Sequence, residues 1–257
     1  MKQFSISILR YLNYRNQIRF NDVFIASYPK SGNTWLSYII ANIVISYNNL
    51  PIKVTQYSVR NFVSEMHTHA KLPNAIEPFP RFIKTHNKEC HFFHNSIYLV
   101  RNPIQTMASY YIYCLSLGHI PQDTTFNKFI RMKSFGINNW IHHTEGWLKR
   151  TKIGSNVQIF RYEDLKEDTY TEIQRMLDVL GLKISSEIVK NAIDNSDRTR
   201  MGSDVYKSMQ SKFTRADLNY KFVREDTNRP RTNIDDDSLA LITSKTKSLA
   251  SELGYQL

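Results

Sequence analysis

Cysteines, long apolar runs and linker-like segments are all scarce in this chain of 257 residues. The two cysteines, Cys90 and Cys114, form no paired motif, which excludes a disulfide scaffold and a cysteine-rich zinc site and favours a reducing, cytoplasmic location. The most apolar stretch, residues 35–46, is shorter than the roughly 18 residues that a membrane-spanning helix needs. No repeat or linker divides the sequence, so residues 1–257 are predicted to form a single domain.

Basic residues are in excess, with 34 Lys and Arg against 23 Asp and Glu, which gives a net charge of +11. Such an excess indicates an anionic partner. A nucleic acid, a membrane surface and a phosphorylated cofactor all fit this charge. The charge alone does not choose among them.

Strand-like and helix-like patterns alternate along the chain. Four short apolar runs are predicted to be strands covered on both faces: 23–26, 82–83, 97–100 and 157–160. Segments with helical spacing follow the first, third and fourth of these runs. The alternation predicts an α/β fold with a central parallel sheet and helices on both sides.

The two ends of the chain and a long polar segment complete the pattern. The first 20 residues are interpreted as an amphipathic lead-in helix. Near the other end, three acidic residues precede a helix whose apolar face is predicted to contain Leu239, Ile242, Leu249 and Leu253. The basic segment 203–231 lacks periodicity and is predicted to be a long functional loop or lid.

A phosphate cradle is predicted where the first strand turns into the first helix, over residues 24–35. A helix start offers free backbone N–H groups and a positive dipole end. Gly32 permits close backbone approach, and Lys30 adds a mobile positive charge. Further donors come from Ser31, Asn33 and Thr34. The segment lacks the GK[ST] ending of a Walker A loop, and on spacing alone an ordinary turn remains open.

A second anion site is predicted at the end of the third strand. Arg101 lies at the carboxyl end of that strand, where open α/β sheets bind ligands, and Pro103 suits the first position of a helix. Ser109 lies two turns into the same helix. An arginine and a serine together suit a phosphate dianion.

Lys84 and His86 follow the second strand and are predicted to enter one cleft, because alternate strand residues point to the same side. A histidine there can accept a proton, and a lysine can neutralise developing charge. His86 is one of eight histidines, and the residues alone do not single it out. His67 with His69, and His91 with His94, lack an identifiable third ligand, so no metal is expected.

Several of these segments resemble the PAPS-dependent sulfotransferases, where PAPS is 3′-phosphoadenosine 5′-phosphosulfate. YPKSGNTW at 28–35 resembles the 5′-phosphosulfate loop of that family, with Asn33 in place of the usual Thr, a change expected to matter little. RNPIQTMASYY at 101–111 resembles its 3′-phosphate motif, KTH at 84–86 its catalytic segment, and YEDL at 162–165 a segment near the adenine. In the C-terminal lid motif, Arg224 matches, whereas Glu225 and Asp226 depart from it.

The resemblance implies a P-loop-like core and transfer of the sulfuryl group of PAPS to a hydroxyl or amine of a small organic acceptor. It implies His86 as the base, with Lys30 and Lys84 stabilising the transferring and leaving groups. Binding of PAPS is then assigned to the following residues: Lys30, Ser31, Gly32, Asn33, Thr34, Trp35, Arg101, Ser109, Tyr162 and Arg224.

Other functions stay open at this point. A P-loop-like nucleotide kinase, a glycan sulfotransferase and a basic anion-binding protein each fit part of the pattern. The favoured interpretation has a small-molecule acceptor and neither a nucleic acid nor a membrane as partner. The identity of the acceptor, transfer to oxygen or to nitrogen, and the oligomeric state are not encoded in any recognisable motif.

Overall fold

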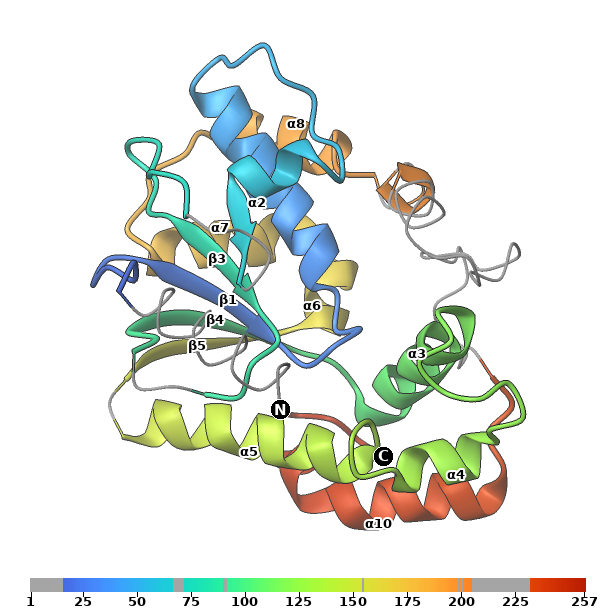
Figure 1. The fold of residues 1–257 in the computed structure, drawn as a ribbon. Helices are drawn as coiled ribbons and strands as arrows, with labels where there is room; N and C mark the ends of the chain where they lie inside the picture. The colour runs from blue at the N-terminus through green and yellow to red at the C-terminus, as the bar shows by residue number, and fades with distance from the viewer. Residues whose placement is uncertain are drawn as a thin grey trace.

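Five parallel strands form the centre of the computed structural model, with helices above and below them (Figure 1). The structure describes residues 16–66, 72–89, 92–153, 155–197, 199, 201–204 and 232–257. The strands are β1 (Val23–Ser27), β2 (Val63–Glu65), β3 (Phe82–Thr85), β4 (Asn95–Val100) and β5 (Asn156–Arg161). The prediction of an α/β fold with a parallel sheet flanked by helices is confirmed.

The order of the strands in the sheet is β2-β3-β1-β4-β5, so β1 lies at the centre. It pairs in parallel with β3 on one side and with β4 on the other. The chain thus places β2 and β3 on one side of β1, and β4 and β5 on its other side. This is the topological switch point at which open α/β sheets leave a crevice beyond the carboxyl ends of their strands.

One face of the sheet is covered by α2 (Asn33–Tyr47), α6 (Tyr162–Glu167), α7 (Thr169–Val179) and α8 (Ser186–Asp194) (Figure 1). Val23 and Ile25 of β1 pack into the core on this side. Helix α2 is buried along almost its whole length, which explains why its sequence is apolar nearly all round. The short 3-10 turn η1 (Ser58–Asn61) precedes β2.

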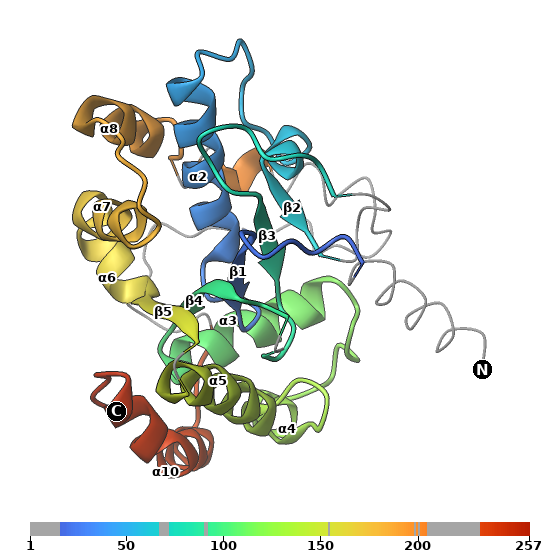
Figure 2. The same ribbon diagram turned by 90° about the vertical axis from the view of Figure 1, so that its left-hand side faces the viewer.

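The other face is covered by α3 (Pro103–Ser116), α4 (Phe126–Arg131), α5 (Ile137–Lys152) and α10 (Asp236–Glu252) (Figure 2). Phe24 and Ala26 of β1 pack on this side, so alternate residues of one strand enter two separate cores. Trp140 and Trp147 of α5 are fully buried in this core.

Helix ends follow the local chemistry of the sequence. The side chain of Asn102 accepts hydrogen bonds from the backbone N–H groups of Ile104 and Gln105, and Pro103 occupies the first helical position of α3. Asp235 caps α10 by accepting from the backbone of Ser238. Gly181, with φ of +68°, lies just beyond the end of α7, where a glycine readily adopts this conformation.

The structure also corrects the sequence-based interpretation in two places. The three-residue strand β2 was not predicted. Leu239 is 41% exposed and does not belong to the buried face of α10, which is lined instead by Ser238, Ile242, Thr246 and Ala250. The predicted lead-in helix lies largely, and the predicted lid 203–231 almost entirely, outside the described residues.

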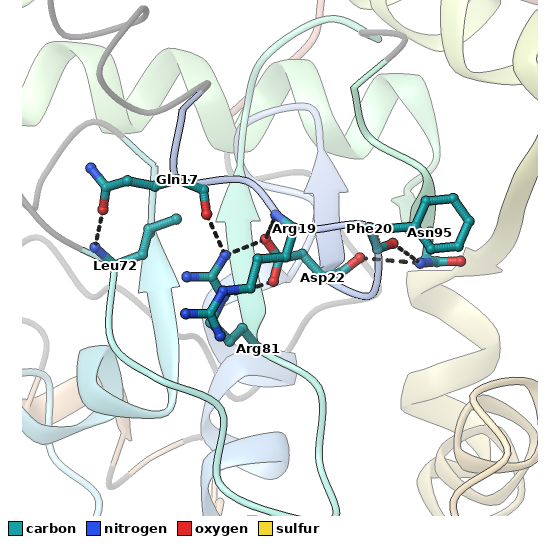
Figure 3. Close-up of polar contacts among 7 residues, drawn as sticks. All are labelled: Gln17, Arg19, Phe20, Asp22, Leu72, Arg81 and Asn95. Carbon is teal, nitrogen blue, oxygen red and sulfur yellow. Dashed lines mark hydrogen bonds and ion pairs between the residues drawn. The ribbon is translucent and has the colours of Figure 1, made fainter.

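The amino ends of β1 and β3 are joined by a buried ion pair (Figure 3). Arg81 Nε donates to Asp22 Oδ1 at 2.7 Å, and Arg81 Nη2 donates to Asp22 Oδ2 and to the backbone oxygen of Gln17. Asp22 also accepts from the backbone N–H of Arg19 at 2.8 Å. The two side chains are therefore desolvated, but their charges are matched by several hydrogen bonds.

Helices of the described part of the chain are all too short or too polar to cross a membrane.

Candidate active site

The carboxyl ends of all five strands carry polar or charged residues. Glu65 ends β2, Lys84 lies in β3 shortly before His86, Arg101 directly follows β4 and Tyr162 directly follows β5. The loop 28–32 follows the central strand β1. The parallel topology places all these groups along one edge of the sheet.

The loop 28–32 has the backbone shape of an anion cradle. Lys30 and Gly32 both adopt positive φ values, +72° and +97°, and α2 begins directly after Gly32. A positive φ is costly for lysine, and its persistence next to a helix start indicates a functional constraint. The hydroxyl of Ser31 is buried and has no hydrogen-bond partner among the described residues, which fits a group that binds a ligand oxygen.

Gly32 is required by close packing as well as by its backbone angle. A Cβ atom at this position would collide with the ring of Tyr162. The guanidinium of Arg101 stacks over that same ring at 4.7 Å, and its Nη1 donates to the backbone oxygen of Lys30 at 3.1 Å. The structure thus brings together Lys30, Gly32, Arg101 and Tyr162, all of which were predicted to bind the cofactor.

His86 is held at the end of the central strand. Its Nδ1 lies 2.9 Å from the backbone oxygen of Ser27, and the Ser27 hydroxyl lies 3.3 Å from the same nitrogen. A carbonyl oxygen can only accept, so Nδ1 carries the proton and the neutral ring presents an unprotonated Nε2.

The environment of His86 favours its neutral form. Enclosure by protein, followed by the positive charge of Lys84, lowers the pKa of the imidazole to about 4. Part of the side chain is nevertheless exposed to solvent, and hydration of that part opposes the shift. The lowered pKa makes the ring a proton acceptor at neutral pH.

Lys84 sits between two oxygen-bearing side chains. Its Nζ lies 3.6 Å from Glu65 Oε1 and donates to Thr34 Oγ1 at 3.4 Å. The residues Glu65 and Lys84 are paired in register across β2 and β3, which accounts for their contact. Burial alone would raise the pKa of Glu65, but the positive charges of Lys84 and Arg60 lower it overall.

The side chains of Lys30 and Trp35 are placed by aromatic contacts. Lys30 Nζ lies 4.5 Å from the ring centroid of Tyr113 on α3. Trp35 is buried, its indole N–H donates to the backbone oxygen of Ser196, and its ring meets that of Tyr162 edge-on. Stacking of Trp35 on an adenine stays a prediction.

Two further predicted residues are placed less directly. Ser109 is buried on α3, in the helix that begins beside Arg101. Arg224 lies outside the described residues, as do Arg229 and Arg231, so the predicted lid over the 3′-phosphate stays a prediction. The described ranges contain no group of three or more His, Cys, Asp or Glu side chains arranged to hold a metal ion.

Sequence reasoning missed three contributions to this site. Ser27 was given no role, although both its carbonyl and its hydroxyl approach His86. Glu65 was missed because the short strand β2 carries too few residues to show a pattern. Asn33 was predicted as a donor of the phosphate cradle, yet its side chain bonds to two residues of β1.

Comparisons with known proteins agree with this geometry. The family model described as "Sulfotransferase domain" matches residues 20–226. Bovine Sulfotransferase 1E1 is 29% identical over 211 residues, which cover 72% of this chain and 67% of that protein. Rat Sulfotransferase 1 family member D1 is 31% identical over 199 residues, covering 70% and 65% respectively. The alignments thus span about two thirds of the relatives' lengths.

Solved structures show the same fold. A crystal structure of retinol dehydratase in a complex with retinol and PAP superposes with a TM-score of 0.69 at 16% identity, covering 95% of this chain and 86% of that one. The crystal structure of mouse sulfotransferase SULT7A1 complexed with PAP gives a TM-score of 0.63 at 21% identity, covering 89% and 84%. At these identities the likeness establishes the fold.

Proposed function

This chain belongs to the sulfotransferase family, and we propose that it transfers the sulfuryl group of PAPS to a hydroxyl or amine of a small organic acceptor. Membership confirms the resemblance stated from the motifs and the expectation of a sulfotransferase enzyme. The other product is adenosine 3′,5′-bisphosphate, abbreviated PAP. The observation that carries the proposal is the position of His86 beside a backbone cradle that suits phosphate. Its Nδ1 lies 2.9 Å from the backbone oxygen of Ser27.

The cradle and Arg101 are assigned to the donor nucleotide. The buried, unpartnered hydroxyl of Ser31 and the N–H groups at the start of α2 suit the 5′-phosphosulfate. Arg101, with Ser109 on the following helix, suits the 3′-phosphate, and Tyr162 beside Arg101 is assigned to the adenine side. PAPS supplies the activated sulfuryl group when it is bound.

His86 is assigned the role of base. Its unprotonated Nε2 takes the proton from the acceptor hydroxyl or amine as the new bond to sulfur forms. The bond between sulfur and the bridging oxygen breaks, and its electron pair stays on the phosphate of PAP. Lys30 and Lys84 stabilise the negative charge that develops on the leaving and transferring oxygens.

A small acceptor and a cytoplasmic location are part of the same proposal. The retinol dehydratase structure holds retinol together with PAP, which supports a small organic molecule as the second substrate. A zebrafish relative, 28% identical over 205 residues, is named Cytosolic sulfotransferase 1, which supports the location expected from cysteine usage.

The first test is calorimetric titration of the protein with PAP, PAPS and ATP at physiological salt. PAP and PAPS are expected to bind much more tightly than ATP, because only they carry a 3′-phosphate for Arg101. Preferential binding of ATP with a requirement for Mg²⁺ would instead support a nucleotide kinase. Weak binding of all three nucleotides with a steep salt dependence would support a general anion-binding protein.

The second test assigns the base. His86→Ala is expected to abolish turnover of PAPS with an acceptor found by screening phenols, alcohols and amines, while PAP binding is retained. His142→Ala is the matched control, because the side chain of His142 is exposed on α5. Retained turnover in His86→Ala would refute the role of His86 and leave the donor assignment standing.

A further inference from the structure

The side chain of Asn33 lies behind the site and bonds to the central strand. It is 3% exposed, and its Nδ2 donates to the backbone oxygen of Ile25 and to the hydroxyl of Ser27, each at 3.0 Å. We propose that Asn33 is a positioning residue that fixes the ring of His86 through Ser27. The proposal deepens, and rests on, the assignment of His86 as the base.

The hydrogen-bond chain has a defined direction. Both hydrogens of the Asn33 amide are donated, so the Ser27 hydroxyl oxygen accepts one of them. A remaining lone pair of that oxygen faces His86 Nδ1 at 3.3 Å, next to the Ser27 carbonyl oxygen at 2.9 Å. The Nδ1–H group of His86 thus meets two acceptors, which hold the ring in the tautomer with Nε2 unprotonated.

The orientation of the Asn33 amide is itself fixed. A flipped amide would place Oδ1 against the carbonyl oxygen of Ile25, which is repulsive. In the observed orientation Oδ1 is buried and has no partner within the described ranges. Burying Oδ1 without a hydrogen-bond partner costs free energy. That this cost is tolerated indicates that the two hydrogen bonds donated by Nδ2 matter at this position.

Threonine, the usual residue here in the resembling loop motif, cannot make the same arrangement. Its hydroxyl has one hydrogen to donate, whereas the amide of Asn33 donates two. The expectation that this difference matters little holds for the backbone N–H, which any residue supplies. The side-chain contact with Ser27 differs, and there we infer that exchanging asparagine for threonine does matter.

Charged groups around His86 act on it differently. Lys84 on β3, Glu65 on β2 and Lys30 in the cradle loop influence the proton affinity of the ring through charge, and His143 on α5 is itself influenced by His86. In contrast, the Nδ1–H group of His86 donates a hydrogen bond to the backbone oxygen of Ser27. Orientation and tautomer therefore depend on Ser27 and Asn33, and the tautomer is the quantity that separates this role from general electrostatics.

The test compares Asn33→Thr with Asn42→Thr in full-length protein labelled with ¹⁵N-histidine. Asn42 is a matched control, because it is also buried on α2 and donates to a serine hydroxyl, that of Ser196, away from His86. The His86 resonances are assigned by comparison with His86→Ala. Wild type and Asn42→Thr are expected to show the Nδ1–H tautomer, and Asn33→Thr a mixture of tautomers.

Kinetics provide the second readout. Asn33→Thr is expected to lower kcat about ten- to hundredfold, as misplacement of a reacting group does, with an unchanged dissociation constant for PAP. A wild-type tautomer and wild-type kcat in Asn33→Thr would overturn the inference even if His86→Ala is inactive. An active His86→Ala would overturn the base assignment instead, whatever the NMR spectra of Asn33→Thr show.

A second variant covers the case in which Asn33→Thr does not fold. Ser27→Ala removes the hydroxyl that links the two residues and keeps the carbonyl oxygen. It is expected to shift the His86 resonances and lower kcat without changing PAP binding. Unchanged resonances and kcat in Ser27→Ala would equally overturn the inference.

Discussion

The two ends of the sheet are built on opposite principles. At the amino ends of β1 and β3, the buried Asp22 and Arg81 are matched in charge and joined by two hydrogen bonds (Figure 3). At the carboxyl ends, Lys30 and Gly32 hold positive φ values, and the buried hydroxyl of Ser31 has no partner among the described residues. One end satisfies its charged groups internally, and the other leaves the buried Ser31 hydroxyl for the proposed ligand.

The difference separates stability from activity. A satisfied buried ion pair stabilises the fold once both partners are present, because removing one leaves an unmatched charge. A strained loop with unsatisfied donors destabilises the free protein and persists because the surrounding structure enforces it. Substitutions at the amino end are therefore expected to change the free energy of unfolding, and those at the carboxyl end to change catalysis.

Arg81→Met is expected to have the largest effect on stability. It leaves the carboxylate of Asp22 buried without its cation, and the free energy of unfolding should fall by about 3–5 kcal/mol. Urea denaturation followed by circular dichroism measures this change. For the folded fraction, kcat should equal that of the wild type, since the pair lies at the opposite end of the strands from His86.

The double variant Asp22→Asn/Arg81→Met controls for the loss of charge. Because it leaves no buried ion, it should recover part of the lost stability. Equal stability of the single and double variants would show that the pair contributes through shape rather than charge. A lowered kcat at full folding would break the proposed division between the two ends.

Gly32→Ala is expected to affect stability and activity together. The positive φ of Gly32 costs an alanine about 1–3 kcal/mol, and its Cβ would also displace Tyr162, on which Arg101 stacks. Affinity for PAP should fall because Arg101 is disturbed. Thermal unfolding and calorimetric titration with PAP measure the two effects.

Gly181→Ala supplies the matched control for the backbone effect. Gly181 also has a positive φ, +68°, but a Cβ there would meet no atom within 4 Å. The Gly181→Ala variant should be less stable than the wild type but should bind PAP with the same affinity. Equal PAP affinity in the two variants would show that contact between Gly32 and Tyr162 is unimportant for the cofactor site.

Much of the fold was predictable from local chemistry, whereas the connections inside the site were not. Buried parallel strands are apolar on both faces, and this pattern located β1, β3, β4 and β5. The loop before α2 and the arginine after β4 were identified because phosphate binding imposes characteristic residues at strand ends. These motifs consist of residues that are close together in the sequence, so they can be recognised without a structure.

Contacts between distant segments leave no such trace. Ser27 and His86 are 59 positions apart, and only the parallel pairing of β1 with β3 brings them together. Glu65 reaches Lys84 through the register of a strand that has three residues. The alternation of strand residues predicted which side Lys84 and His86 share, but not what they would meet there.

Glu65→Gln is expected to have the smallest effect and to sharpen the electrostatic side of the comparison. Burial and the positive charges of Lys84 and Lys30 lower the pKa of His86, and the negative charge of Glu65 opposes them only in part. Removing the charge of Glu65 should therefore lower the pKa of His86 again. His86 must be neutral to act as base, so activity rises as pH increases through this pKa.

The acidic limb of the pH profile of kcat/KM should accordingly move to lower pH in Glu65→Gln. Glu172→Gln is the control, since its carboxylate pairs with Arg175 on the surface helix α7 and lies on another element. A limb that moves to higher pH would mean that Glu65 acts mainly by holding Lys84 close to His86, through the 3.6 Å contact between Lys84 Nζ and Glu65 Oε1. In that case the pKa of His86 would depend more on the position of Lys84 than on the number of charged side chains around it.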